Sequence, residues 1–276
     1  MTEEPSILLT NDDGIDAPGI AVLADELVEV ADVTVLAPLE NKSGVGRIRS
    51  WDDVVIEEHE LGHAVHGTPV DCVVTGVVAL ETDFDLVVSG INAGPNVGAH
   101  VLGRSGTVGA AIEAGFLGLP AIAASMYDPK ELPPGSPSHG DFEVAAAAIR
   151  FLVERLTDGG LATLTDQVAI EDAAGPDYLN VNAPADRKNP PMRLTRPSTS
   201  YGLRGTVTET TVEFEDAFWE GIRTGEVEDP VGTDRRAVVD REVSVSPLTA
   251  PRPSFDPGGE LIEEFRAGEV IEQLRG

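Results

Sequence analysis

The residues best suited to chemistry in this chain are two adjacent carboxylates, Asp12 and Asp13, which follow a short apolar run over residues 6–10. Two like charges this close together are costly unless a cation or hydrogen-bond donors compensate them. Hard cations such as Mg²⁺ or Mn²⁺ prefer oxygen ligands of this kind. A turn in which aspartate caps backbone amides is the structural alternative. The position at the end of a buried strand, beside two further polar loops, favours a metal site.

The two further loops contain Ser43, in the sequence NKSG, and Asn92, in the sequence SGINAGPN. Each residue alone is typical of a turn in a glycine-containing loop. Together with Asp12 and Asp13 they would form a site of carboxylate, hydroxyl and amide oxygens. Such a site carries little excess negative charge and leaves room for water, which suits catalysis better than metal storage.

The segment Ser105-Gly106-Thr107 opens a predicted helix of small residues. A helix start of this type presents free backbone N–H groups and the positive end of the helix dipole, which attract an anion. An ordinary helix cap would use the same residue types. The glycine-rich loop that contains Asn92 runs directly into this helix start, so the pattern predicts a pocket for a metal ion and a phosphate. No dinucleotide-binding glycine fingerprint, Walker loop or Gly-x-Ser-x-Gly elbow is present.

The elements that must position these residues alternate between short apolar strands and amphipathic helices. This alternation predicts an α/β fold with a mainly parallel sheet covered on both faces. In such sheets ligands bind beyond the carboxyl ends of the strands, where the polar loops lie. The expected strands are residues 6–10, 33–37, 54–56, 64–66, 85–89, 121–125 and 178–181, and the expected helices are residues 20–30, 69–80, 107–117 and 142–156.

The character of the chain changes near residue 184, where alternating strand patterns over residues 206–212 and 242–245 begin. We therefore expect an α/β catalytic core over residues 1–184. Residues 185–276 are expected to form a smaller β-rich extension for oligomerisation, with a final helix over residues 260–274.

The composition restricts the class of protein. The chain has 276 residues, 19 basic and 48 acidic, a formal net charge of −29, and only one cysteine, Cys72. With 41% hydrophobic residues it is not a disordered acidic chain. An acidic surface with so few lysines indicates a halophile's protein, since molar salt screens the repulsion. No basic stripe exists for a nucleic-acid polymer, and neither a secretory signal nor a membrane-spanning run is found. We expect a soluble, cytoplasmic protein with no membrane partner.

The ordered set of motifs resembles the SurE family of survival-protein nucleotidases, and the charge suggests a halophilic archaeon as the source. The resemblance covers about 230 residues and its motifs occur in family order. The matching stretches are residues 7–20, 41–44, 66–73, 87–98, 105–111, 179–184 and 233–248.

The resemblance implies a metal-dependent phosphomonoesterase acting on nucleoside monophosphates, with one divalent cation, Mg²⁺ or Mn²⁺, in each subunit. It also implies a Rossmann-like three-layer core whose β-rich extension exchanges a hairpin with a partner, giving a homodimer or a homotetramer. By matching positions, the metal ligands are Asp12, Asp13, Ser43 and Asn92, of which the two aspartates are also catalytic, and the phosphate-binding residues are Asn96, Ser105, Gly106 and Thr107.

The resulting hypothesis is hydrolysis of nucleoside 5′-monophosphates, with 3′-nucleotides as further candidate substrates. No histidine is well placed as a general acid, so protonation of the leaving group stays unassigned. A haloacid-dehalogenase-like phosphatase is a weaker alternative, because it requires one residue between its aspartates and a later lysine. A non-catalytic nucleotide- or metal-binding regulator is the alternative from another class. Arg104 stands where the family often has an aromatic residue, which bears on base or ribose preference.

Overall fold

The computed structural model describes residues 4–80, 82–130, 137–165, 175–224 and 226–251. A nine-stranded sheet forms its centre, with the strand order β3-β4-β2-β1-β5-β6-β7-β11-β8. All pairings are parallel except β3 with β4 and β7 with β11. The strands of this sheet are β1 (Ser6–Thr10), β2 (Asp32–Pro38), β3 (Ile56–His59), β4 (Gly62–Val65), β5 (Leu86–Ala93), β6 (Ala121–Tyr127), β7 (Tyr178–Pro184), β8 (Met192–Leu194) and β11 (Val243–Leu248).

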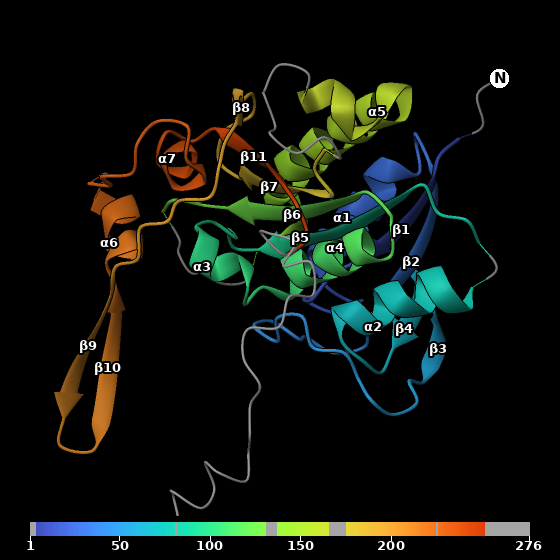
Figure 1. Cartoon of the computed structure of the whole chain (residues 1–276), viewed down its shortest axis with the longest axis horizontal. Helices are drawn as coiled ribbons and strands as arrows, with labels where there is room; N and C mark the ends of the chain where they lie inside the picture. Colours follow the sequence, from blue (N-terminus) through green and yellow to red (C-terminus); the bar gives the residue numbers. More distant parts are fainter. Residues whose placement is uncertain (1–3, 81, 131–136, 166–174, 225, 252–276) are drawn as a thin grey trace, which may run out of the picture.

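Helices cover both faces of this sheet and give three layers (Figure 1). The helices α1 (Pro18–Leu27) and α5 (Glu143–Thr165) pack together over one face. The opposite face carries α2 (Pro69–Val74), which continues as a π-helix over Thr75–Ala79, and α4 (Gly106–Phe116). The predicted α/β fold with a mainly parallel, doubly covered sheet is confirmed.

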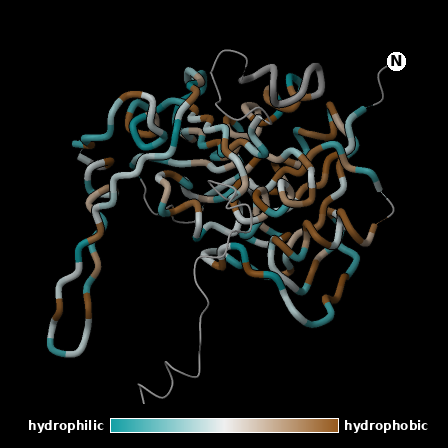
Figure 2. The backbone as a smooth tube through the Cα atoms, in the orientation of Figure 1, coloured by the Kyte–Doolittle hydropathy of each residue, from teal (hydrophilic) through white to brown (hydrophobic). Residues whose placement is uncertain are grey.

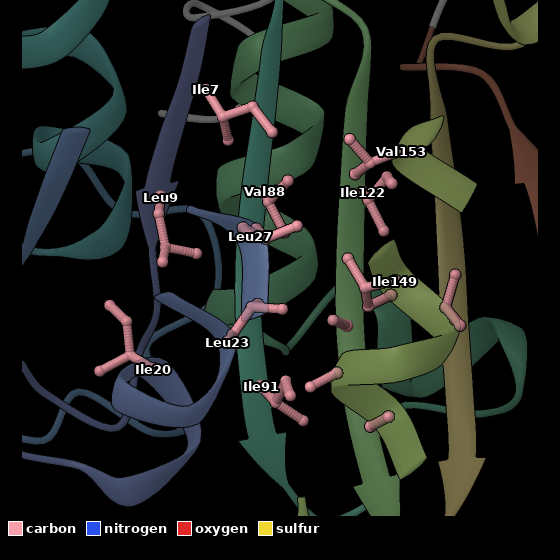
Figure 3. Packing of buried hydrophobic residues seen from close by; sticks show 14 of the residues in the cluster. Ile7, Leu9, Ile20, Leu23, Leu27, Val88, Ile91, Ile122, Ile149 and Val153 are labelled. Atoms are coloured by element: carbon pink, nitrogen blue, oxygen red, sulfur yellow. The ribbon is translucent and has the colours of Figure 1, made fainter. Parts of the chain in front are cut away.

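Strand β1 shows how the sequence builds the two cores. Ile7 and Leu9 are fully buried with α1 and α5, in the cluster that also contains Val88 and Ile122 (Figure 3). Leu8, on the opposite face, is fully buried in a second cluster with residues of α2 and α4. Since successive strand side chains point to opposite faces, a continuous apolar run is what a strand covered on both sides requires. Figure 2 shows this hydrophobic character along the central strands.

Two parts of the segment after residue 184 behave differently. β8 and β11 join the core sheet, and β11 lies antiparallel to β7. In contrast, β9 (Leu203–Thr208) and β10 (Thr211–Asp216) form a separate antiparallel hairpin that extends away from the body (Figure 1). The predicted single strand over residues 206–212 is wrong, because residues 209–210 form the turn of this hairpin.

Several other elements differ from the sequence expectation. The helix α5 begins one residue later than predicted and extends well beyond residue 156. Three short helices were not predicted, because each is too short to show a clear apolar period. The predicted final helix over residues 260–274 lies outside the described residues. The unpredicted helices are α3 (Ala99–Leu102), α6 (Ala217–Thr224) and α7 (Asp234–Val239).

Within the described residues, none of the helices has the length and apolar character needed to cross a membrane.

Candidate active site

The predicted site residues come together at the carboxyl end of the sheet, around β1. This strand lies between β2 and β5, so the order of the strands reverses at β1. Such a reversal leaves a crevice at the carboxyl ends of the strands, where ligands bind. A cleft of about 420 Å³ opens there. Of the predicted site residues, Asp12, Ser43, Asn92, Asn96 and Ser105 line it.

Asp12 lies at the centre of this arrangement and is almost completely buried, with 2% of its surface exposed. Its Oδ1 atom accepts a 2.6 Å hydrogen bond from the Thr107 hydroxyl, and its backbone oxygen accepts one of 2.6 Å from the Lys42 amide. The pKa of Asp12 is raised to about 6, chiefly by burial; the Thr107 hydrogen bond lowers it and the charge of Asp13 raises it. Ionisation of the buried Asp12 carboxylate therefore costs free energy, and a bound cation would offset this cost.

Asp13 joins two other loops to the end of β1. Its Oδ2 atom accepts a 3.0 Å hydrogen bond from the Ala93 amide, and its Oδ1 atom accepts one of 3.2 Å from the Ser43 hydroxyl. The pKa of Asp13 is raised by burial, and the hydrogen bonds from Ala93 and Ser43 oppose the shift. The second carboxylate is thereby fixed between the loops that carry Ser43 and Asn92.

The loop that carries Ser43 is held in place from the start of α2. Thr68 caps this helix in a reciprocal capping box with Asp71. The same Asp71 carboxylate accepts hydrogen bonds of 2.8 and 2.7 Å from the amide and hydroxyl of Ser50, and the Thr68 hydroxyl donates to the Ile48 carbonyl at 2.6 Å. The motif around residues 67–72 therefore starts a helix, as its sequence indicated, and also anchors a site loop.

Asn92 reaches the site through an irregularity in β5. The register against β6 pairs Ser89 with Ala123 and then Asn92 with Ser125, so β5 contains one extra residue. Such a bulge redirects the side chains that follow it. The amide nitrogen of Asn92 donates to the Gly94 carbonyl at 2.5 Å, which leaves the amide oxygen as the atom able to ligate a cation.

Asn96 is held by polar side chains that project from β6 and β7. Its side-chain nitrogen donates to the Ser125 hydroxyl at 3.0 Å, and its backbone amide donates to Asn182 Oδ1 at 2.7 Å. Its backbone oxygen accepts from the side chains of Asn180 and Asn182 at 2.9 and 3.2 Å. These buried bonds fix both the backbone and the side chain of Asn96 at the wall of the cleft.

The start of α4 closes the other side of the site. Ser105 is the cap residue, and its hydroxyl accepts a 3.1 Å hydrogen bond from the Val108 amide. Gly106 lies directly against Asp12, since a Cβ atom at this position would be 2.8 Å from both the Cβ and Oδ2 atoms of Asp12. The first backbone amides of a helix have no partner inside it and suit an anion. Here the Val108 amide donates to the cap and the Thr107 amide to the Asp12 carboxylate, which leaves the Gly106 amide for an anion.

The donor set fits a hard divalent cation. It provides two carboxylates, of which Asp12 carries a raised pKa because it is buried, together with the hydroxyl of Ser43 and the amide oxygen of Asn92. The described residues contain no cluster of three or more His, Cys, Asp or Glu side chains suited to a metal. A site with only two carboxylates suits Mg²⁺ or Mn²⁺, which keep several water ligands.

Sequence reasoning missed Trp219 and the network behind Asn96. Trp219 lines the same cleft as Asp12, and so does Arg104, which the sequence had connected with base or ribose preference. Nothing in the sequence around Trp219 indicates that α6 folds back to the site, because the contact is made over a long separation. The alternation of asparagine with apolar residues over 179–184 was a usable signal, since a polar residue inside a buried strand needs a partner.

The fold and site define a Rossmann-like α/β protein in which one carboxylate of an adjacent pair, Asp12, contacts a helix N-terminus, an arrangement compatible with metal-assisted chemistry on a phosphate group. The sequence model of the family described as Survival protein SurE matches residues 7–202, and the chain belongs to the SurE family.

Individual relatives agree with this assignment. The chain is 51% identical over 253 residues to the 5′-nucleotidase SurE of Natronomonas pharaonis, covering 90% of this chain and 94% of the relative. It is 52% identical to the 5′-nucleotidase SurE of Halobacterium salinarum, covering 90% and 93%. Both organisms are halophilic archaea. The crystal structure of the SurE protein from Aquifex aeolicus superposes with a TM-score of 0.71 at 28% identity, covering 98% of each chain.

Proposed function

We propose that this protein is a metal-dependent phosphomonoesterase that hydrolyses nucleoside 5′-monophosphates to nucleoside and phosphate, with 3′-nucleotides as further candidate substrates. The observation that carries the proposal is the contact of the Asp12 carboxylate with Gly106 and Thr107 at the start of α4, beside the cleft that Asp12, Asn96 and Ser105 line. The names of the relatives from Natronomonas pharaonis and Halobacterium salinarum support the choice of a 5′-nucleotide.

In this proposal Asp12, Asp13, Ser43 and Asn92 hold one divalent cation. When bound, the cation would supply a Lewis acid and lower the pKa of a coordinated water. Asp13 keeps its ligand geometry through the hydrogen bonds from Ala93 and Ser43. Outer hydrogen bonds of this kind orient metal ligands and tune their basicity.

The phosphate group is assigned to Asn96 and to the segment Ser105, Gly106 and Thr107. The Gly106 amide at the start of α4, the positive end of that helix and the Asn96 side chain would bind the non-bridging oxygens as charge develops on them, since the Val108 amide donates to Ser105 and the Thr107 amide to Asp12. Rigid positioning of these donors avoids reorganisation during the reaction. Among the described residues that line the cleft there is no histidine, and protonation of the leaving oxygen stays unassigned.

Membership of the SurE family and the adjacent positions of Asp12 and Asp13 set aside the haloacid-dehalogenase-like phosphatase. A non-catalytic nucleotide- or metal-binding regulator would need the same cation and phosphate contacts, so only turnover separates it from an enzyme.

The test is phosphate release from a panel of nucleoside 5′- and 3′-monophosphates in molar KCl. The protein is treated with EDTA and then supplied with Mg²⁺ or Mn²⁺, using wild type, Asp13→Asn and the control Asp52→Asn on an exposed loop. Activity that returns with metal, persists in the control and collapses in Asp13→Asn supports the proposal. Folded wild-type protein that releases no phosphate under any metal would establish the regulator instead.

The assembly is proposed to be a homodimer or homotetramer formed through the hairpin of β9 and β10. Cross-strand pairing places Val207 opposite Val212, with Phe214 and Leu203 on the same face of the hairpin. All four side chains are exposed, Val207 to 78% and Phe214 to 70%. Apolar faces of this kind mark interaction surfaces. A second copy of the chain would cover this face, and the cytoplasm of a salt-adapted cell is the proposed location.

A further inference from the structure

We propose that Trp219 is the stacking platform for the nucleobase of the substrate. This inference rests on the proposed function and extends it to the part of the substrate that does not react. Trp219 lines the cleft of about 420 Å³ that also contains Asp12, Asn92 and Asn96. The cleft thus combines polar side chains suited to a cation and phosphate with an indole ring in its wall.

The fold holds α6, and therefore Trp219, at the cleft. The neighbouring Phe218 and Ile222 are each 6% exposed and belong to a small apolar cluster with Val97 and Tyr127. Val97 directly follows Asn96 in the chain. The helix that carries Trp219 is therefore packed against the segment that carries a predicted phosphate-binding residue.

Two further contacts fix the start of α6. The Asp216 carboxylate accepts a 2.9 Å hydrogen bond from the Phe218 amide. The Arg235 guanidinium lies 3.6 Å from the centre of the Phe218 ring and donates a 2.7 Å hydrogen bond to the Ser200 carbonyl. The Phe218 ring lies 4.9 Å from the Trp219 ring. Trp219 is held by its neighbours while its own side chain stays half-buried at the cleft.

The shape and chemistry of the cleft match a nucleoside monophosphate. Its lining combines the apolar side chains of Pro95 and Val101 and the Trp219 ring with the polar side chains of Asp12 and Ser105, which the proposed function assigns to the cation and the phosphate. A volume of about 420 Å³ is in the range of small-molecule sites. A flat aromatic base can stack on an indole face without base-specific hydrogen bonds, and a two-ring purine overlaps it over a larger area. We therefore expect purine nucleotides to be preferred over pyrimidine nucleotides.

The test compares adenosine 5′-monophosphate with ribose 5-phosphate, which keeps the sugar and phosphate but lacks the base. For Trp219→Ala, kcat/KM for the nucleotide is expected to fall about tenfold or more, the size of one base–aromatic stack. Ribose 5-phosphate hydrolysis is expected to stay unchanged, and Trp219→Phe is expected to restore most of the nucleotide activity. Trp51→Ala is the matched control, because Trp51 is 90% exposed and does not line the cleft.

Two results would overturn the inference: equal losses on both substrates, which indicate a structural role, or an unchanged kcat/KM for the nucleotide. If wild type hydrolyses neither substrate with any metal, the proposed function fails and the base subsite is tested by binding. The chain has two tryptophans, so Trp51→Phe leaves Trp219 as the only one. Fluorescence that adenosine 5′-monophosphate quenches, and ribose 5-phosphate does not, supports the platform, whereas equal or absent quenching contradicts it.

Discussion

The Thr107 hydroxyl donates a 2.6 Å hydrogen bond to Oδ1 of Asp12, across 95 residues of sequence. This bond links the end of β1 to the first turn of α4. Both groups are buried, so neither can exchange its partner for bulk water. The position of the carboxylate is therefore determined by the helix that is proposed to bind the phosphate.

Thr107→Val removes this donor while keeping the shape of the side chain. We expect metal affinity and kcat/KM to fall by about 10- to 100-fold, the usual effect of removing a hydrogen-bond partner of a metal ligand. Thr107→Ser keeps the hydroxyl and is the control. Titration with Mn²⁺ and steady-state kinetics measure the effect, and equal values for Val and Ser would refute the role of the hydroxyl.

Gly106→Ala introduces a methyl group 2.8 Å from Asp12. Alanine favours a helix over glycine by up to about 1 kcal/mol, so helix propensity alone predicts a neutral or stabilising change. We expect a loss of activity instead, since Asp12 must shift away from the site. Gly103→Ala is the matched control, because a Cβ atom there meets nothing within 4 Å. Full activity in Gly106→Ala would show that the carboxylate can move without consequence.

Asp12 has its pKa raised by burial from 3.8 to about 6. Between these values the folded chain binds more protons than the unfolded chain, so the free energy of unfolding falls as the pH rises through this window. The neutral Asp12→Asn side chain escapes this penalty. In protein without bound metal, the free energy of unfolding of Asp12→Asn is therefore expected to rise relative to that of wild type. The increase is up to roughly 3 kcal/mol as the pH goes from about 4 to about 7.

Urea unfolding of wild type and Asp12→Asn in EDTA and molar KCl measures this difference at both ends of the window. The paired comparison cancels the general repulsion within the acidic chain. Added Mg²⁺ should stabilise wild type and leave Asp12→Asn nearly unchanged at neutral pH, because a ligand stabilises only the state that binds it. A constant difference across the window would argue against a buried, charged Asp12.

Arg104 lines the cleft and makes no ion pair among the described residues, although the chain has 48 acidic residues. Its charge is available to an anionic substrate. Arg104→Gln is expected to lower kcat/KM several-fold, more at low salt than in molar KCl, because the screening length falls from about 10 Å to about 3 Å. Arg49→Gln, which removes an exposed arginine outside the cleft, is the control. A loss independent of salt would point to a structural role.

The hairpin of β9 and β10 provides a test of assembly. Phe214→Ser on its apolar face is expected to reduce the molar mass measured by light scattering toward that of one chain. Glu213→Ser, on the opposite face of the same strand, should leave the mass unchanged, since successive residues point to opposite sides. A wild-type protein that is already monomeric in molar KCl would contradict the proposed dimer or tetramer.

The sequence predicted the strands of the parallel core and the place of the polar loops, because both depend on local patterns. Apolar runs such as residues 6–10 identify buried strands, and Asp12 follows from its place after one of them. The hairpin turn at residues 209–210 and the position of Trp219 could not be predicted in this way. The polar faces of the hairpin strands resemble a solvated loop, and the approach of α6 to the cleft depends on packing between distant segments.

The attachment of the Ser43 loop to α2 has a consequence for protein engineering. Asp71 and Thr68 bind this loop at Ser50 and Ile48, which follow the proposed cation ligand Ser43 in the chain. If this loop were transferred to a protein that lacks these two residues, it would lose the hydrogen bonds that fix its conformation. Recombination experiments in this fold should therefore transfer residues 41–50 and 67–71 together, although a turn and a strand pair separate them in the chain.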